Sequence, residues 1–291
     1  MFSNSIILFA TALIGIANAG TWCGKPYREP TNSQPEVPNH GVFPALPSWP
    51  PADVLAVTPR WKPIYKADQS VEFIVDVPSN ALETKIILYF GAGMTHEVPV
   101  NTGANIIVVP NTKLRESSAV TALLGSTKAN ATFMIYKNPV SGTSATVRVD
   151  YLHGSLVPEK NRTSPPVFPF GFYVEYEPWM VKDPVGNMKE LKDMGVNFVH
   201  MVPPYDDRLI PTLKAAEDLG MWMQYDMRHT YKNTSKITAE VNNVKTYEHI
   251  VSWYTSDEPD GETRNEPQDS INAYNTIISI DPHRPTMLVL N

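Results

Sequence analysis

A regular alternation of strand-like and helix-like segments in residues 170–291 most constrains the fold. Segments rich in β-branched and aromatic residues, typical of strands, lie at 170–176, 196–204, 221–227, 251–259 and 285–291. Segments with helical spacing of apolar residues lie between them, at 186–195, 209–220, 235–250 and 267–281. Alternation of this kind predicts a parallel sheet whose strands are joined by crossover helices.

Two closures of such a sheet are possible, an open doubly wound sheet or a (β/α)₈ barrel. No G-x-G-x-x-G follows the first strand, so nothing indicates a dinucleotide site. Polar residues instead follow successive strands: Glu175 and Glu177, Asp206 and Asp207, Asp226 with Arg228 and His229, and Asp257 with Glu258. In a barrel these strand ends converge on the face that holds active sites, so we expect a TIM-type barrel.

The number of strands limits this expectation. A barrel of this type has eight strands, whereas the pattern ends with a fifth strand at 285–291. We therefore expect a barrel truncated after strand five, from a shortened chain or an incomplete gene model. An open five-stranded sheet is the alternative.

The residues before the alternating region have a different pattern. Short alternating strands separated by turn residues predict a β-sandwich over residues 56–157, in which 112–128 leaves room for one helix. Residues 158–169 are typical of a linker. Residues 20–55 are rich in proline, which predicts an extended arm.

The N-terminus is typical of a secretory signal. Residues 1–19 contain the apolar run SIILFATALIGIA and end in ANA, a small-x-small cleavage pattern. The run is shorter than the ~20 residues of a membrane span, so we expect no membrane anchor and a secreted protein, extracellular or in a cell wall. Asn130, Asn161 and Asn233 begin N-glycosylation sequons. The lone Cys23 is a free thiol, or its partner lies on another chain or in sequence beyond this one.

Composition excludes some functions. The sequence is 42% hydrophobic and 19% charged, as in globular proteins, with a formal net charge of −6. With this charge and no basic cluster, we expect no nucleic-acid partner. The histidines lack the spacing of metal ligands, so we expect no metal and no cofactor.

The fourth predicted strand leads into a dense acidic turn, in WYTSDEPDG at residues 253–261. Side chains alternate along a strand, so Glu258 shares a face with Tyr254 and Ser256. This parity points Glu258 into the mouth of a barrel unless a bulge intervenes. The alternative is a solvated acidic loop in which Pro259 and Gly261 make a turn.

The DEP of this turn resembles the Asn-Glu-Pro motif that ends strand four in the clan of retaining (β/α)₈ glycoside hydrolases. The segments WCGKPYR, QYDMRHTY, WYTSDEPDG and IDPHRPTMLVLN also resemble secreted fungal proteins described as having a glycoside-hydrolase core. The resemblance implies that Glu258 is the general acid/base. Asp257 stands where the clan has asparagine, and the clan's nucleophile ends strand seven, which we expect in C-terminal sequence beyond residue 291.

We expect a sugar substrate to contact residues at these strand ends. The candidates are Asp257, Asp226, Arg228, Glu175 and Tyr254. Asp226 and Arg228 could equally form a surface ion pair, and Trp222 is expected in the core. The sequence contains no G-x-S-x-G motif, so nothing indicates an esterase.

The sequence thus predicts a secreted glycoside hydrolase that acts on an oligo- or polysaccharide. The alternative is a non-catalytic carbohydrate-binding or cell-wall-associated protein.

Overall fold

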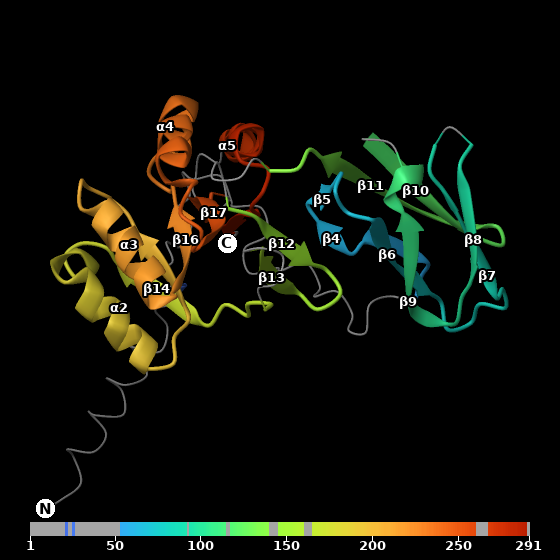
Figure 1. Ribbon diagram of the computed structural model, residues 1–291, viewed down its shortest axis with the longest axis horizontal. Coiled ribbons are helices and arrows are strands. Elements are labelled where there is room, and N and C mark those ends of the chain that lie inside the picture. Colours follow the sequence, from blue (N-terminus) through green and yellow to red (C-terminus); the bar gives the residue numbers. More distant parts are fainter. Residues whose placement is uncertain are drawn as a thin grey trace, which may run out of the picture. The chain divides into compact units, whose positions relative to one another are not determined.

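The computed structural model describes residues 21–22, 25–26, 53–91, 93–114, 117–139, 145–159, 165–259 and 267–289 (Figure 1). The chain divides into two compact units, Met1–Leu46 and Pro47–Asn291. In the first unit, β1 (Thr21–Trp22) pairs antiparallel with β2 (Lys25–Pro26). The predictions about the signal segment, Cys23 and Asn161 concern positions outside the described residues.

The second unit begins with two sheets that share one hydrophobic core. The first sheet has the order β3-β6-β9, with β3 (Ala56–Pro59), β6 (Ser70–Val77) and β9 (Gly103–Pro110). The second has the order β5-β11-β10-β7-β8, with β5 (Ile64–Tyr65), β7 (Lys85–Tyr89), β8 (Thr95–Pro99), β10 (Ser117–Leu124) and β11 (Thr127–Tyr136). Phe73, Leu88 and Val120 are completely buried between them. This arrangement is the expected sandwich.

Two expectations for this region are wrong. The described residues between 112 and 128 hold no helix beyond the short 3₁₀ turn η1 (Asn111–Lys113), because Val120, Ala122 and Leu124 alternate into the core from β10. The last expected sandwich strand is β12 (Val147–Asp150), which lies instead in a third sheet of order β13-β12-β4. The other members of that sheet are β4 (Trp61–Lys62) and β13 (Ser155–Pro158).

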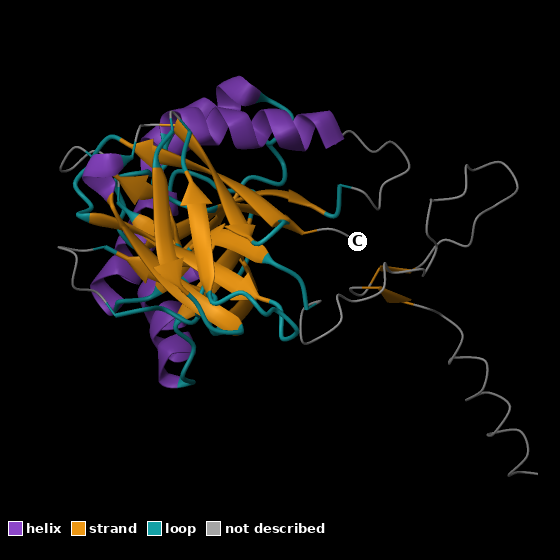
Figure 2. Cartoon of the chain, turned by 90° about the vertical axis from the view of Figure 1, so that its right-hand side faces the viewer, coloured by secondary structure: helices purple, strands orange, loops and turns teal. Residues whose placement is uncertain are grey.

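The remainder of the second unit is the expected alternating region. The α-helices of the described residues lie here, whereas the preceding part consists mainly of strands (Figure 2). The strands are β14 (Gly171–Glu175), β15 (Phe198–Val202), β16 (Trp222–Asp226), β17 (Ile250–Asp257) and β18 (Thr286–Val289). The helices are α2 (Pro184–Asp193), α3 (Leu209–Leu219), α4 (Thr234–Val244) and α5 (Pro267–Ile280), with the 3₁₀ turn η2 (Met180–Lys182) before α2. All four strand pairs are parallel.

Local sequence explains where these helices begin and end. The Asp183 side chain caps α2 by accepting a hydrogen bond from the Gly186 N–H, and Pro184 follows it at the first helical position. Helix α3 ends at Gly220, whose φ of 67° suits glycine.

Helix α4 ends at Val244, earlier than the expected residue 250. The buried guanidinium of Arg284 donates hydrogen bonds to the carbonyl groups of Lys245 and Tyr247. Those carbonyls are therefore held by a side chain and do not continue the helix.

The two faces of the parallel sheet differ in chemistry. Met201, Met223 and Trp253 face a single hydrophobic core that also contains buried residues of all four helices. The alternate positions, which include His200, Gln224, Asp226, Ser252 and Tyr254, are polar and buried. The strand order is sequential, β14-β15-β16-β17-β18, and the helices share one core on one face. A doubly wound sheet would reverse its order and place helices on both faces.

Among the described residues, no helix is long and apolar enough to cross a membrane.

Candidate functional site

Four neighbouring strands, β14 to β17, bring a polar and aromatic cluster together. His200 on β15 and Asp226 on β16 are both buried, and His200 Nε2 lies 2.6 Å from Asp226 Oδ2. The ring of His200 lies 4.3 Å from that of Tyr173 and 4.5 Å from that of Tyr254, between centroids. Tyr173 comes from β14 and Tyr254 from β17.

Arg228 connects the two aspartates of this cluster. Its Nε donates to Asp226 Oδ2 at 2.7 Å, and its Nη1 donates to Asp257 Oδ2 at 2.7 Å. Its backbone N–H also donates to Asp226 Oδ1 at 2.7 Å. Because Asp226 is 1% exposed, the interpretation of Asp226 and Arg228 as a surface ion pair is wrong. Instead, the pair is the centre of a buried network.

The protonation states of Tyr254 and Arg228 follow from their surroundings in the network. The Tyr254 hydroxyl donates to Asp257 Oδ1 at 2.7 Å. Burial raises the pKa of Tyr254 well above its ordinary value, and hydrogen bonds to Tyr173 and Asp257 add to this. Burial alone would lower the pKa of Arg228, but Asp226 and Asp257 outweigh it, so the pKa is raised. The phenol therefore stays protonated and the guanidinium stays charged.

One donor of this network is left over. Nη2 of Arg228 is buried and has no hydrogen-bond partner among the described residues. Buried donors are nearly always paired, so an unpaired one calls for a ligand or a water molecule. A ligand oxygen at the strand ends would satisfy it.

A bulge near the end of β17 places Asp257 in this network. Tyr254 pairs with Met287 but Asp257 pairs with Val289, so β17 has one extra residue between these pairs. Ser256 turns toward the helices, where its hydroxyl lies 3.1 Å from that of Ser270 on α5. This is the bulge for which the parity argument for Glu258 made an exception, because it interrupts the alternation along the strand.

Glu258 itself lies just beyond β17 in an uncommon backbone conformation. Its φ is 49°, the left-handed region, and its N–H donates to the Val289 carbonyl at 3.0 Å. The residue is 7% exposed, unlike a carboxylate of a solvated loop. A left-handed, non-glycine residue costs about 1–2 kcal/mol, and such residues cluster at functional sites.

Other sequence candidates lie apart from the network. Glu175 is exposed at the end of β14. Asp206 and Glu177 both bind the exposed guanidinium of Arg208, so they form their own surface cluster. Trp222 is partly buried and stacks on His249, with ring centroids 4.6 Å apart.

Sequence reasoning missed two members of the site, Tyr173 and His200. The available signal was a polar residue inside an apolar strand, in FYVEY and in NFVHMV. Tyr173 and His200 are register partners in neighbouring strands, and His200 pairs in turn with Gln224. Alignment of the strands would have placed them in one row.

No group of three or more His, Cys, Asp or Glu side chains among the described residues could hold a metal ion. Of the predicted glycosylation sites, Asn130 is exposed on β11 and Asn233 is exposed at the start of α4. Their glycosylation stays a prediction.

The fold and site define a sheet-rich α/β chain with a largely buried polar cluster on sequential parallel strands. No protein-family model and no curated protein matches the sequence. Similar solved structures include a β-D-glucuronidase from Dictyoglomus thermophilum, with 15% identity and a TM-score of 0.41, covering 83% of this chain and 45% of that one.

A GH2 β-galacturonidase from Eisenbergiella tayi has 15% identity and a TM-score of 0.39, with 81% of this chain and 46% of that one covered. An FMN-binding β-glucuronidase from Facaelibacterium prausnitzii L2-6 has 16% identity and a TM-score of 0.36, with 82% and 39% covered. The chain thus spans less than half the length of these structures. At TM-scores this low the likeness defines no family.

Proposed function

We propose that this protein is a secreted carbohydrate-active protein and that its active form is a glycoside hydrolase. The observation that carries the proposal is the position of Glu258, buried and left-handed at the end of the fourth sequential strand. The resemblance of Asp257-Glu258-Pro259 to the retaining clan's motif supports the same assignment. Substrates would be oligo- or polysaccharides.

In this proposal Glu258 is the general acid/base. A glycosidic oxygen is a poor leaving group until it is protonated, and a carboxylic acid at the strand ends can give it that proton. Retaining hydrolysis also needs a nucleophilic carboxylate about 5–5.5 Å from the acid. Asp226 and Asp257 are poor candidates for this role because Arg228 binds both.

The other residues of the cluster would orient the sugar. Nη2 of Arg228 is the unpaired donor for a substrate oxygen, and the ring of Tyr173, which is 49% exposed, offers an apolar face to the C–H groups of a sugar. Asp257 stands where the clan has asparagine, and both of its carboxylate oxygens already accept hydrogen bonds. It therefore acts in our proposal by holding Arg228 in place.

We further propose that the β14–β18 sheet is part of the wall of a (β/α)₈ barrel. The sequential strand order, the single helical layer and the buried polar face support this. In a closed barrel the polar face would line the interior below the substrate.

The test is a screen of chromogenic glycosides and natural oligosaccharides with the mature secreted protein, followed by kinetics of Glu258→Gln. We expect that variant to lose roughly 10²–10⁴-fold in kcat on substrates with poor leaving groups. Loss should be small on glycosides with activated leaving groups, because these need no proton. Glu190→Gln, which changes an exposed carboxylate on α2, is the matched control.

The proposal fails if Glu258→Gln keeps near-normal turnover on a natural glycoside. If no glycoside is cleaved but oligosaccharides bind, the protein is a carbohydrate-binding or cell-wall-associated protein. In that case substitution of Arg228 should abolish binding, since its unpaired donor is then the binding group.

A further inference from the structure

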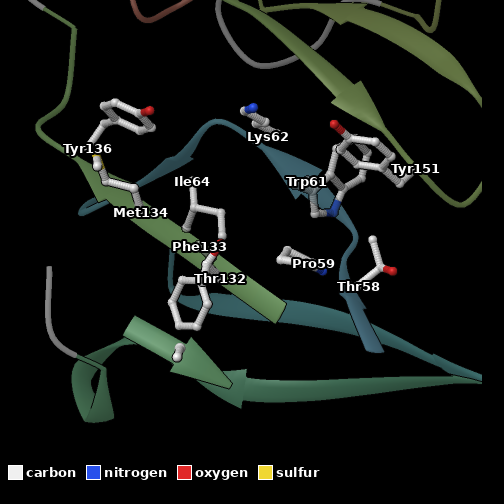
Figure 3. Close-up of a pocket in the computed structure, with 11 residues that line it drawn as sticks. Thr58, Pro59, Trp61, Lys62, Ile64, Thr132, Phe133, Met134, Tyr136 and Tyr151 are labelled. Carbon is white, nitrogen blue, oxygen red and sulfur yellow. The ribbon is translucent and has the colours of Figure 1, made fainter. Parts of the chain in front are cut away.

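A cavity of about 630 Å³ lies in the strand-rich region and is lined by residues that the proposed catalytic site does not use. Its walls come from β3, β4, β5, β10 and β11 and from Tyr151, which follows β12 (Figure 3). None of the residues lining it belongs to the β14–β18 sheet. Its volume is within the range of small-molecule sites, roughly 300–1,000 Å³.

Four of the eleven lining residues are aromatic, Trp61, Phe133, Tyr136 and Tyr151. Tyr136 and Met134 lie on one side in the view of Figure 3, and Trp61 and Tyr151 lie on the other. Met134 is 54% exposed and Tyr151 is 49% exposed, so the cavity is open to solvent at these side chains. Trp and Tyr each combine an apolar ring with a polar tip, a combination that suits a ligand with both C–H faces and hydroxyl groups.

Lys62 gives this cavity a net positive charge. It is the one charged side chain among the lining residues, it is exposed, and it forms no ion pair within the described part of the chain. Its neighbour Arg60 is already engaged, because Asp150 and Glu72 bind its guanidinium at 3.1 Å and 2.7 Å. Burial raises the pKa of Tyr136 and the positive charge of Lys62 opposes this, so the ammonium group acts on the cavity wall.

We propose that this cavity binds a uronate unit of an acidic oligosaccharide, with its ring against the aromatic side chains and its carboxylate at Lys62. The lone cation is the reason for proposing an anionic ligand, since an unpaired ammonium beside apolar surface favours an opposite charge. The indole N–H of Trp61 and the hydroxyls of Tyr136 and Tyr151 favour a hydroxylated ligand. A purely hydrocarbon ligand would leave these polar groups unpaired.

The experiment compares acidic probes with neutral counterparts. Binding of tetragalacturonate and of its methyl ester to the full chain is measured by titration calorimetry. In parallel, a glucuronate-bearing xylo-oligosaccharide is compared with the unsubstituted xylo-oligosaccharide. We expect at least one acidic probe to bind with an affinity about ten-fold or more higher than that of its neutral partner. A charge-assisted contact contributes a difference of this size.

Variants then locate the site. Lys62→Gln should remove the preference for the acidic probe, whereas Lys128→Gln, the same change at an exposed position of β11 outside the cavity, should keep it. Tyr151→Ser should weaken both members of the pair, whereas Tyr89→Ser, at a 39% exposed tyrosine of β7, should not.

The proposal is overturned if no acidic probe binds, if acidic and neutral probes bind equally, or if Lys62→Gln leaves the preference intact. Circular dichroism of each variant verifies that it is folded before its affinity is compared.

Discussion

At the scale of single residues, Arg228 stabilises one buried and one partly buried carboxylate at once. Its side chain is 16% exposed, and those of Asp226 and Asp257 are 0% and 23% exposed. Removal of the cation would take from both carboxylates the guanidinium that binds them. Loss of one partner of such a buried pair is strongly destabilising, although the intact pair itself contributes little.

We therefore predict that Arg228→Met lowers the free energy of unfolding by about 3–5 kcal/mol, measured by urea denaturation. Arg208→Met is the matched control, because Arg208 also binds two carboxylates, Asp206 and Glu177, but at an exposed position. Its effect should be much smaller, since solvent screens surface ion pairs. Equal effects of the two substitutions would contradict the buried network.

Glu258 allows a second residue-scale prediction, because its backbone and its side chain can be tested separately. Glu258→Ala and Glu258→Gly both remove the side chain, but only glycine adopts a φ of 49° without strain. The glycine variant should be more stable to urea than the alanine variant by about 1 kcal/mol, while both lose activity. A less stable glycine variant would show that the residue does not hold this conformation in solution.

At the scale of elements, the sequence predicts most of what is local. The helices follow from apolar spacing and from caps such as Asp183 and Gly220, and the strands follow from β-branched runs. The bulge in β17 is different, because it depends on how β17 pairs with β18, some thirty residues later in the sequence. Parity along the sequence therefore does not give the direction of the Glu258 side chain.

The same reason explains the other errors. The membership of β12 in a third sheet depends on pairing with β4, and its end at Asp150 is held by Arg60, far away in the sequence. Tyr173 and His200 enter the site only through the register of two strands. The sequence marks residue types and their periods, whereas long-range pairing decides which residues meet.

Helix α4 provides an element-scale prediction, because its cap is also a glycosylation sequon. Oδ1 of Asn233 accepts a hydrogen bond from the Lys236 N–H at 3.0 Å. Asn233→Ala should cost about 1 kcal/mol through loss of the cap. In protein that lacks glycans, Asn233→Asp should keep the cap and Ser235→Ala should leave it untouched.

Thermal or urea unfolding of these three variants checks the prediction, and mass spectrometry of secreted protein shows whether the sequon is used. Equal stability of Asn233→Ala and Asn233→Asp would show that the cap contributes nothing.

At the scale of the whole molecule, Asp150 predicts how stability depends on pH. Burial would raise its pKa, but hydrogen bonds from Arg60, from His153 and from the Leu152 N–H outweigh burial and lower the pKa to about 2. Since the folded-state pKa lies below the unfolded value, the carboxylate stabilises the fold above pH ~4. That contribution, about 2 kcal/mol, is lost as the pH falls from ~4 to ~2.

Urea denaturation across this pH range should therefore show a steeper loss of stability for the wild type than for Asp150→Asn. Asp218→Asn is the control, because Asp218 forms an exposed ion pair with Lys214 on α3. Parallel pH profiles of wild type and Asp150→Asn would refute the assignment.

The bulge in β17 has a further consequence, for how this site can change in descent. If one residue between Tyr254 and Asp257 were deleted, the regular alternation would return and Asp257 would keep its pairing with Val289. Glu258 would then also keep its place beyond the strand. The bulge therefore lets a single codon be lost here without moving either acid, so related chains should differ at this strand end in length while both acids stay in place.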